Sequence, residues 1–278
     1  MGHHYLPRYY LKGFLQNPQS RFLYQYEKGK GRAIKGSLEN LAQENNLYSP
    51  ELETRLNAEI EEPAKRILDK IRGKLRISET EKKTFSEYVV IMMMRIPEKK
   101  ETVKQWFESV KEPYFDRLES DLIGMRTSRP EKKDIIERRL QELKGVRDKG
   151  TISSEEIWHS VVDLARFPKI LWAIQNMTWN FLVSNNLSIL TGDNPVSYFK
   201  DIGLKDNRAE LCFPISKDIA LLAGWQNNKD CQYLSAKANE IHEINRRTSA
   251  FAVRYVFHHR DEEWVLKLLN KITVAQHP

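Results

Sequence analysis

The sequence is poor in the features that mark secreted, membrane and thiol-dependent proteins. It has only two cysteines, Cys212 and Cys231, and they form no Cys-x-x-Cys pair. A disulfide framework is therefore not expected. No apolar run reaches the roughly 20 residues that a membrane-spanning helix needs, and the polar, aromatic N-terminus does not resemble a secretory signal. We expect a cytoplasmic protein with no membrane partner.

Common catalytic signatures are also missing. The chain has no Gly-x-Ser-x-Gly, no phosphate-binding Gly-rich loop ending in Lys-Ser/Thr, and no His-Glu-x-x-His. These absences argue against a serine hydrolase of the nucleophile-elbow type, a P-loop nucleotidase and a zincin. No internal repeat and no low-complexity segment is present either, so a solenoid is not expected.

What the sequence does have is material for a core. Its 278 residues are 40% hydrophobic and include six tryptophans, which suits one large domain. We predict a single compact α+β domain. A motif and hairpin (1–50) and a C-terminal α+β part (178–278) build one small mixed or antiparallel sheet, and a mostly helical middle (51–177) packs on it.

Local patterns place the elements of the first two thirds. Alternating aromatics around Gly29-Lys-Gly31 predict a hairpin over 21–35, and 37–48 reads as a short helix or irregular turn. Apolar residues recur every three or four positions from Glu51, and Pro63 should kink or split that helix. Further helices are expected over 78–96, over 99–148 as a long charged antiparallel excursion, over 153–165 and over 168–177.

The last third of the sequence has patterns typical of β-strands. Strands are expected over 179–183, 187–190, 211–216, 219–225 and 251–258, with helices over 235–247 and 262–271. Alternation of apolar residues along these segments is the signal for the strands.

The formal net charge of +7 favours an anionic partner, of which nucleic acid is the commonest. Lysine and arginine are interleaved with acidic residues almost everywhere, however, as on ordinary solvated helices. A nucleic-acid partner and a protein partner both stay open on charge alone.

The first fourteen residues are dense in imidazole, guanidinium and phenol. Pro7 fixes its own φ and favours an extended Leu6, which would hold His4 and Arg8 in place on a packed surface. Two plainer interpretations stay open: His3-His4 as the scar of an affinity tag, and a solvated arm anchored by its aromatic side chains.

Arg95 ends a helix, 78–96, that is apolar on every side in its second half. A guanidinium at the end of a buried helix needs an anion or a carbonyl as partner, and it can also cap the helix C-terminus. Glu53, Glu59, Glu61 and Glu62 crowd around the break before Pro63. We expect most of them on the wet face of the helix, with Glu61 as the exception.

Several motifs together resemble a bacterial family known as domain of unknown function 4238. They are His4-Tyr-Leu-Pro-Arg-Tyr-Tyr-Leu-Lys-Gly-Phe14, Glu44-Asn-Asn-Leu-Tyr48, Leu52-Glu53 through Ile60-Glu61, Arg95-Ile-Pro97 and Thr191-Gly-Asp-Asn-Pro-Val196. The likeness spans residue 4 to about 225. It implies a prokaryotic, cytoplasmic α+β protein and brings no established activity.

The polar residues of these motifs suggest a metal site. If His4, Glu44, Glu61 and Asp193 converge, they form an oxygen-rich site for Mg²⁺ or Mn²⁺. With Arg8 or Arg95 neutralising phosphate, such a site suits hydrolysis of phosphodiesters in RNA or DNA. We therefore predict a metal-dependent nuclease, with a defence or toxin role as a guess from the family. The alternative is structural: Asp193-Asn-Pro as an Asx-turn, and His4 and Arg8 paired with Glu44 or Glu61.

Two other functions stay open. Arg254-x-x-x-x-His259 has the spacing of the arginine–histidine motif of the HEPN ribonucleases, which need no metal, but a strand here would send the two side chains to opposite faces. The third is a non-catalytic module that binds nucleic acid or a protein. It would use the basic helical middle and the aromatics Tyr9, Tyr10, Trp106 and Trp225.

Overall fold

The computed structural model describes residues 2–45, 47, 49–149, 156, 158, 162, 167–199, 201–226 and 229–276. The chain divides into two compact units. The first comprises Met1–Pro97 and Ala165–Pro278, and the second comprises Glu98–Leu164. The charged helical excursion belongs to the second unit, and the single domain expected from the sequence stays a prediction.

The largest sheet of the first unit has five strands in the order β10-β5-β9-β8-β7. β10 pairs with β5 in parallel and the other neighbours are antiparallel. The strands are β5 (Thr178–Val183), β7 (Ser197–Tyr198), β8 (Glu210–Ser216), β9 (Ile219–Gly224) and β10 (Gln232–Ser235). Residues of β5, β8 and β9 are almost all buried, because helices cover both faces of this sheet.

A second sheet joins the two ends of the chain. Its order is β3-β2-β11-β6, from β2 (Phe22–Glu27), β3 (Ala33–Ser37), β6 (Thr191–Gly192) and β11 (Tyr255–His258). The hairpin expected over 21–35 is confirmed as β2–β3. The prediction that N- and C-terminal strands share a sheet is therefore right for these four strands, and the other C-terminal strands form the five-stranded sheet instead.

A two-stranded sheet holds the N-terminus. β1 (Gly2–His4) pairs antiparallel with β4 (Gln43–Asn45), so that His3 lies opposite Glu44 and His4 opposite Gln43. The segment 37–48, predicted as a short helix or irregular turn, thus contains a strand. Polar Gln-Glu-Asn carries no apolar alternation, so only the partner strand reveals it.

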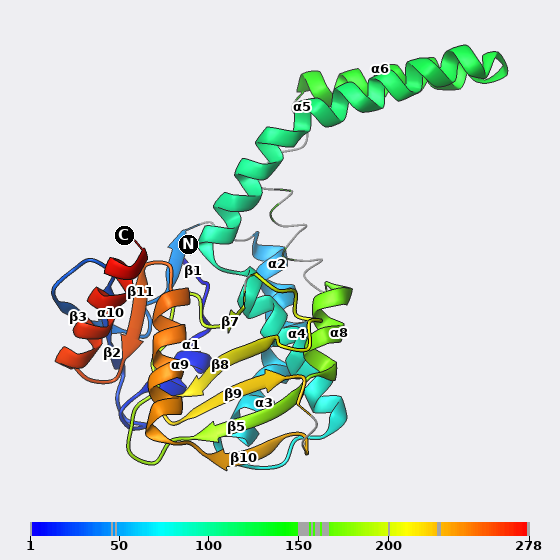
Figure 1. The fold of residues 1–278 in the computed structure, drawn as a ribbon. Coiled ribbons are helices and arrows are strands. Elements are labelled where there is room, and N and C mark those ends of the chain that lie inside the picture. Colours follow the sequence, from blue (N-terminus) through cyan, green and yellow to red (C-terminus); the bar gives the residue numbers. More distant parts are fainter. Residues whose placement is uncertain are drawn as a thin grey trace. The chain divides into compact units, whose positions relative to one another are not determined.

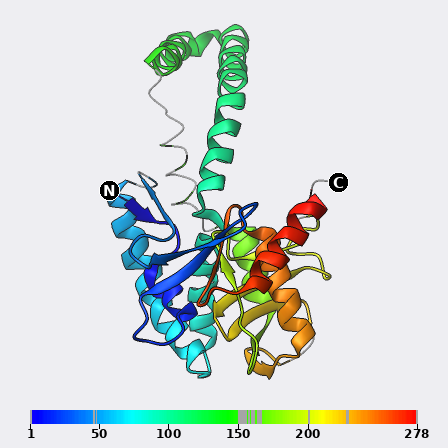
Figure 2. The same ribbon diagram turned by 90° about the vertical axis from the view of Figure 1, so that its left-hand side faces the viewer.

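Helices cover the sheets. Figures 1 and 2 show α3 and α4 on one face of the five-stranded sheet and α9 on the other. The helices of this unit are α1 (Arg8–Leu11), η1 (Lys12–Phe14), α2 (Pro50–Leu56), η2 (Asn57–Glu61), α3 (Glu62–Arg72), α4 (Glu79–Met94), α8 (Pro168–Asn176), α9 (Ala238–Phe251) and α10 (Glu263–Gln276).

The helix over 78–96 begins as its sequence predicts. Ser78 Oγ accepts a hydrogen bond from Glu81 N, and Glu81 accepts one from Ser78 N, which forms a capping box. Its apolar second half is buried, including Tyr88. Phe85 and Tyr88 pack against Phe213 of the five-stranded sheet, with ring centroids 6.2 and 6.3 Å away.

The strand expected over 187–190 does not form. Ser184 Oγ accepts a hydrogen bond from Leu187 N and donates one to Leu187 O, which bends the chain. Leu190 N then donates to Asn245 Oδ1 of α9 instead of to a neighbouring strand. Ile189 and Leu190 are buried, whereas Leu187 is exposed, and the backbone N–H groups of Ile189 and Leu190 donate to Lys217 O and to the Asn245 side chain.

The second unit contains a helical hairpin. α5 (Pro97–Ser128) is followed by η3 (Pro130–Lys132) and α6 (Lys133–Lys149). Arg147 of α6 binds Glu112, Asp116 and Glu119 of α5 at 2.7, 2.9 and 3.5 Å, so the two helices run antiparallel as expected. Most of the helix expected over 153–165 lies outside the described residues.

The predicted α+β class is confirmed, although the strands among the described residues form three sheets rather than one. Among the helices of the described residues, none combines the length and apolarity needed to cross a lipid bilayer.

Candidate functional site

The N-terminal segment is locked into the body of the first unit. Tyr10 is fully buried, and its hydroxyl donates to Pro214 O at 2.9 Å and lies 2.8 Å from Thr191 Oγ1. Arg72 of α3 donates to the carbonyl oxygens of Tyr9 and Tyr10. The segment is therefore neither a solvated arm nor a surface tail, and its side chains have fixed positions.

Pro7 orients the two candidate cationic residues. It precedes α1 with φ −57° and ψ 138°, so the chain turns from the extended β1 into a helix at Arg8. His4 ends β1 and Arg8 begins α1. Leu6 between them is completely buried, which fixes both sides of the turn.

Arg95 holds three segments together. Its side chain is 5% exposed, Nη1 lies 2.5 Å from Glu61 Oε1, and Nη2 donates to His4 O at 2.7 Å. The sequence predicted that Arg95 needs an anion or a carbonyl as partner, and it has one of each: the Glu61 carboxylate and the His4 carbonyl. Arg95 and Glu61 connect α4, η2 and β1, and this role is structural.

Glu61 occupies its position because the helix widens there. Residues Asn57–Glu61 form a π-helical turn between α2 and α3. Pro63 has no N–H, and its ring would clash with the carbonyl of Glu59 in a regular α-helix. A wide turn relieves that clash, and such turns often occur at functional sites. The break predicted at Pro63 is therefore a π-turn.

A cleft of about 730 Å³ opens beside these residues. His4, Arg8, Glu61 and Arg95 all line it, so four predicted catalytic residues meet at one place. The rest of the lining comes from α1, η1, α2, η2, α3 and the turn at Leu38: Pro7, Tyr9, Lys12, Leu38, Glu39, Pro50, Glu53, Thr54, Asn57 and Lys65. We call it the His4 cleft.

The imidazole of His4 stays neutral at pH 7. Burial lowers its pKa below 6.5, the neighbouring Arg8 and Arg95 lower it further, and hydrogen bonds to backbone carbonyls partly oppose this. Nε2 lies 3.2 Å from Leu38 O and 3.0 Å from Gln43 Nε2. The carbonyl only accepts and the amide nitrogen only donates, so the two contacts favour opposite tautomers. A neutral imidazole can accept a proton.

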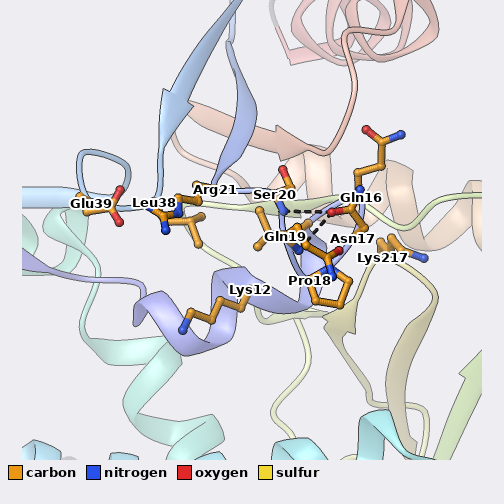
Figure 3. Close-up of a pocket in the computed structure, with 11 residues that line it drawn as sticks. Lys12, Gln16, Asn17, Pro18, Gln19, Ser20, Arg21, Leu38, Glu39 and Lys217 are labelled. Carbon is orange, nitrogen blue, oxygen red and sulfur yellow. Dashed lines mark hydrogen bonds between the residues drawn. The ribbon is translucent and has the colours of Figure 1, made fainter.

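A second cleft of about 910 Å³ continues from the first. Figure 3 shows its lining, which comes mainly from the loop 15–21 between η1 and β2. Lys12, Leu38 and Glu39 line both clefts. We call the two together the Lys12 groove. Asn17 shapes its far end, because Oδ1 accepts hydrogen bonds from Gln19 N and Ser20 N.

Cations dominate the open surface of the Lys12 groove. Arg8, Lys12, Arg21, Lys65 and Lys217 line it. Within the described part of the chain, Arg8, Lys12 and Arg21 make no ion pair. Two of the three lining carboxylates are engaged, since Glu61 binds Arg95 and Glu53 binds the buried His3 at 3.1 Å. The third, Glu39, is exposed, and a backbone hydrogen bond lowers its pKa.

The predicted metal set does not form. Glu44 and Asp193 do not line the His4 cleft. Across the residues that the structure describes, no group of three or more His, Cys, Asp or Glu side chains is placed to hold a metal ion. His4 and Glu44 lie on the paired strands β1 and β4, but Glu44 is opposite His3, so its side chain is on the other face from His4. Glu61 lies on η2, and Asp193 follows β6 of the four-stranded sheet, so the four side chains do not form one metal site.

Asp193 has a structural role instead. Oδ1 accepts from Val253 N at 2.7 Å, and Oδ2 accepts from Arg254 N and Tyr255 N at 2.7 and 2.8 Å. The carboxylate is buried, and burial raises its pKa although these three donors oppose the shift. These hydrogen bonds connect the end of β6 to the start of β11. The role is structural, as in the Asx-turn alternative, but the partners are distant in the sequence.

Arg254 and His259 do not share a site. Arg254 binds Glu27 of β2 at 3.0 Å on the exposed side of the second sheet. His259 lies beyond β11, where it lines a different cavity that does not include Arg254. The spacing typical of the HEPN ribonucleases thus has no matching arrangement here.

Sequence reasoning missed much of the Lys12 groove. Glu53, Asn57, Glu61 and Lys65 are spaced four residues apart and all line the His4 cleft, as do Arg8 and Lys12. This i, i+4 spacing places side chains on one helix face. It is the sequence signal from which these lining residues could have been predicted. We had assigned Glu53 to a wet face, which is partly right because its carboxylate is half-exposed.

The chain matches no protein among the curated proteins and no solved structure. A family model described as "Protein of unknown function (DUF4238)" matches residues 2–262. This covers nearly the whole chain and includes every residue of the Lys12 groove. The resemblance seen in the N-terminal motif, the Arg95-Ile-Pro97 motif and the Asp193-Asn-Pro motif is therefore confirmed: the chain belongs to the DUF4238 family.

Proposed function

We propose that this protein is a nuclease that binds a single strand of RNA or DNA along the Lys12 groove and cleaves it beside His4. The observation that carries the proposal is that two clefts share Lys12, Leu38 and Glu39, so that they adjoin each other and neither is an isolated pocket. An extended polyanion suits such a shape, because successive phosphates can each meet a cation.

The charges of the groove support a phosphate backbone as ligand. Arg8, Lys12 and Arg21 are exposed or half-exposed and have no carboxylate partner within the described residues, so binding phosphate breaks no existing ion pair. Arginine also offers parallel donors that match two phosphate oxygens. Arg95 already binds Glu61 through Nη1 and His4 O through Nη2, and we therefore assign it to positioning rather than to substrate binding.

His4 is the candidate general base. Its neutral imidazole lies in the cleft with Arg8 on the following helix. It would take the proton of an attacking water while the water oxygen bonds to phosphorus and one P–O ester bond breaks. The leaving oxygen would take a proton from solvent, and Arg8 would stabilise the negative charge that develops on phosphate. Lys12 lies one helical turn beyond Arg8 and would hold the next phosphate.

A divalent cation, Mg²⁺ or Mn²⁺, is not needed for this proposal. The two inner carboxylates of the cleft, Glu53 and Glu61, already bind His3 and Arg95. A metal would have to displace one of these partners to gain two carboxylate ligands. The residues present do not fit a resident metal, and we derive no step through one.

The test combines binding and cleavage. Fluorescence anisotropy with labelled 20-nucleotide RNA and DNA measures binding, and denaturing gels measure cleavage with and without EDTA. We expect salt-sensitive binding that Arg8→Ala and Lys12→Ala weaken at least fivefold. His4→Asn should abolish cleavage and leave binding within twofold. Lys30→Ala, an exposed cation in the β2–β3 turn, is the matched control and should change neither.

The outcomes separate the alternatives. Cleavage that EDTA abolishes would restore the metal-dependent mechanism and contradict the role of His4 as base. Binding without turnover under any condition would favour a non-catalytic nucleic-acid-binding module. In that module, Tyr10 could not stack on bases, because it is fully buried. Trp106 on α5 is 57% exposed and could do so. No binding at all would overturn the groove as a nucleic-acid site.

A further inference from the structure

A third cavity, of about 620 Å³, lies on the first unit and shares no lining residue with the Lys12 groove. The end of β11, two helices (α9 and α10) and the turn at 186–188 form its walls. Asn245 of α9 holds that turn in place, because its side chain accepts from Leu190 N and donates to Ser188 O. The cavity is thus built on hydrogen-bonded elements and its size is typical of small-molecule sites, roughly 300–1,000 Å³.

Two buried histidines line one side of the cavity. His258 and His259 are 2% and 9% exposed, and their ring centroids are 4.2 Å apart. His258 Nδ1 lies 2.9 Å from Arg260 O, which leaves Nε2 of the same ring. That Nε2 and His259 Nδ1 are buried without a hydrogen-bond partner in the described part of the chain.

Unsatisfied buried polar atoms are costly, and they often mark a binding site. Burial lowers the pKa of both rings, for His259 to about 4. Both imidazoles are therefore neutral at pH 7. Because His258 Nδ1 is already engaged by Arg260 O, the buried ring nitrogens left without a partner among the described residues are His258 Nε2 and His259 Nδ1. No residue lines both this cavity and the Lys12 groove, although Lys217 of the groove is close enough to lower the pKa of His259. The pair therefore lies outside the site described above.

The rim of the cavity is cationic. Arg260, Lys267 and Lys271 line it, and Glu262 is the one carboxylate among the lining residues. Lys267 binds Glu263 at 3.1 Å, whereas Arg260 and Lys271 have no ion pair within the residues that the structure describes. Two unpaired cations beside one carboxylate favour an anionic group of small size.

The remaining wall is flat and apolar. Trp264 is 36% exposed, lines the cavity and packs edge-on against His258 with ring centroids 5.5 Å apart. Leu187, which is 37% exposed, and Leu268 complete this wall. An exposed indole face beside leucines is a surface on which a planar ring stacks.

We propose that this cavity binds a nucleoside monophosphate, with the base against Trp264 and the phosphate on Arg260 and Lys271. The imidazoles of His258 and His259 provide the polar groups next to the base and sugar. This site is separate from the Lys12 groove, and it stands whether or not the chain cleaves nucleic acid. A phosphate alone would leave the indole unused, and an uncharged nucleoside would leave the two cations unpaired.

Isothermal titration calorimetry of the full chain with adenosine 5′-monophosphate tests the proposal, with adenosine and inorganic phosphate as comparison ligands. We expect saturable binding of the monophosphate that is at least tenfold tighter than that of either comparison ligand. Arg260→Ala with Lys271→Ala, and separately Trp264→Ala, should weaken it at least tenfold. Trp264→Phe keeps a flat ring and should stay within threefold of the unchanged protein.

Lys12→Ala serves as the matched control, because it removes a cation from the groove and leaves this cavity intact. It should bind the monophosphate like the unchanged protein, so failure of the groove proposal and failure of this one are distinguishable. Thermal melting of each variant shows that it is folded. The proposal is overturned if the unchanged protein shows no saturable binding, if Lys12→Ala loses binding as strongly as the cavity variants, or if phosphate or adenosine binds as tightly as the monophosphate.

Discussion

Arg95 and Glu61, which lie 34 residues apart in the chain, form a buried ion pair with Nη1 and Oε1 2.5 Å apart. Removing one partner of such a pair leaves an uncompensated buried charge, at a cost of about 3–5 kcal/mol. We expect Arg95→Leu to lower the free energy of unfolding by this amount in urea titrations. Glu61→Gln keeps an oxygen acceptor and should cost less.

The Arg95→Leu Glu61→Leu double variant should regain part of the loss, because neither charge is then left unpaired. As a control, Arg139→Ala breaks the exposed Arg139–Glu142 pair of α6 and should barely change the stability. If Arg95→Leu were as stable as the unchanged protein, Arg95 would not connect α4, η2 and β1 in solution.

The groove predicts a defined salt dependence. For single strands, the slope of log K against log salt concentration is about −0.7 for each phosphate that a cation neutralises. Lys12→Ala and Arg21→Ala should each make the slope less negative by about 0.7, and the double variant by about twice that. Anisotropy titrations between low and moderate salt measure it. Equal slopes for Lys12→Ala and Lys30→Ala would show that Lys12 touches no phosphate.

Asp193 should matter for stability and not for binding. Asp193→Ala leaves the N–H groups of Val253, Arg254 and Tyr255 without an acceptor, and each unsatisfied buried donor costs about 1–3 kcal/mol. We expect a loss of at least 3 kcal/mol in urea titrations, with Asp193→Asn in between because one oxygen remains. A fully stable Asp193→Ala that had lost only activity would instead restore Asp193 as a functional residue.

The histidine pair makes stability depend on pH. The pKa of His259 falls from 6.5 to about 4 on folding, chiefly because of burial and then because of His258, Arg260 and Lys217. Above pH 6.5 both states are neutral and the stability is complete. Between pH 6.5 and 4 only the unfolded state binds the proton, so the stability falls as the pH falls.

At about 1.36 kcal/mol for each pH unit, His259 should cost roughly 2 kcal/mol at pH 5. Urea titrations at pH 7 and pH 5 should show this loss in the unchanged protein and a smaller one in His259→Gln. The exposed His242 on α9 is the control, and His242→Gln should lose as much as the unchanged protein. An equal pH effect in His259→Gln would mean that other groups cause the acid sensitivity.

Local sequence signals predicted elements better than their assembly. The capping box at Ser78 and the hairpin around Gly29 follow from short-range chemistry, and both are as expected. The strand β4 and the irregular 187–190 segment depend on partners far along the chain, His3 and Asn245 among them, which no local pattern shows.

The candidate site also has features that local sequence signals predict and features that depend on distant residues. His4, Arg8, Glu61 and Arg95 meet because Arg95 needed an anion and a carbonyl, and this requirement was readable from a buried helix end. Asp193 was misjudged because a carboxylate before Asn-Pro suits either a metal or backbone donors. Only the position of β11 shows that three N–H groups already fill its oxygens.

The hydroxyl of Tyr10 reaches Thr191 and Pro214, 181 and 204 positions further along the chain. During synthesis on the ribosome, the segment around Tyr10 is therefore made about 200 residues before the surface that it binds. A chain that stops before β8 cannot close the contact that positions His4 and Arg8. Whatever the Lys12 groove does, it should become competent only after β8 has been made, so chains that stop before β8 are expected to be inactive.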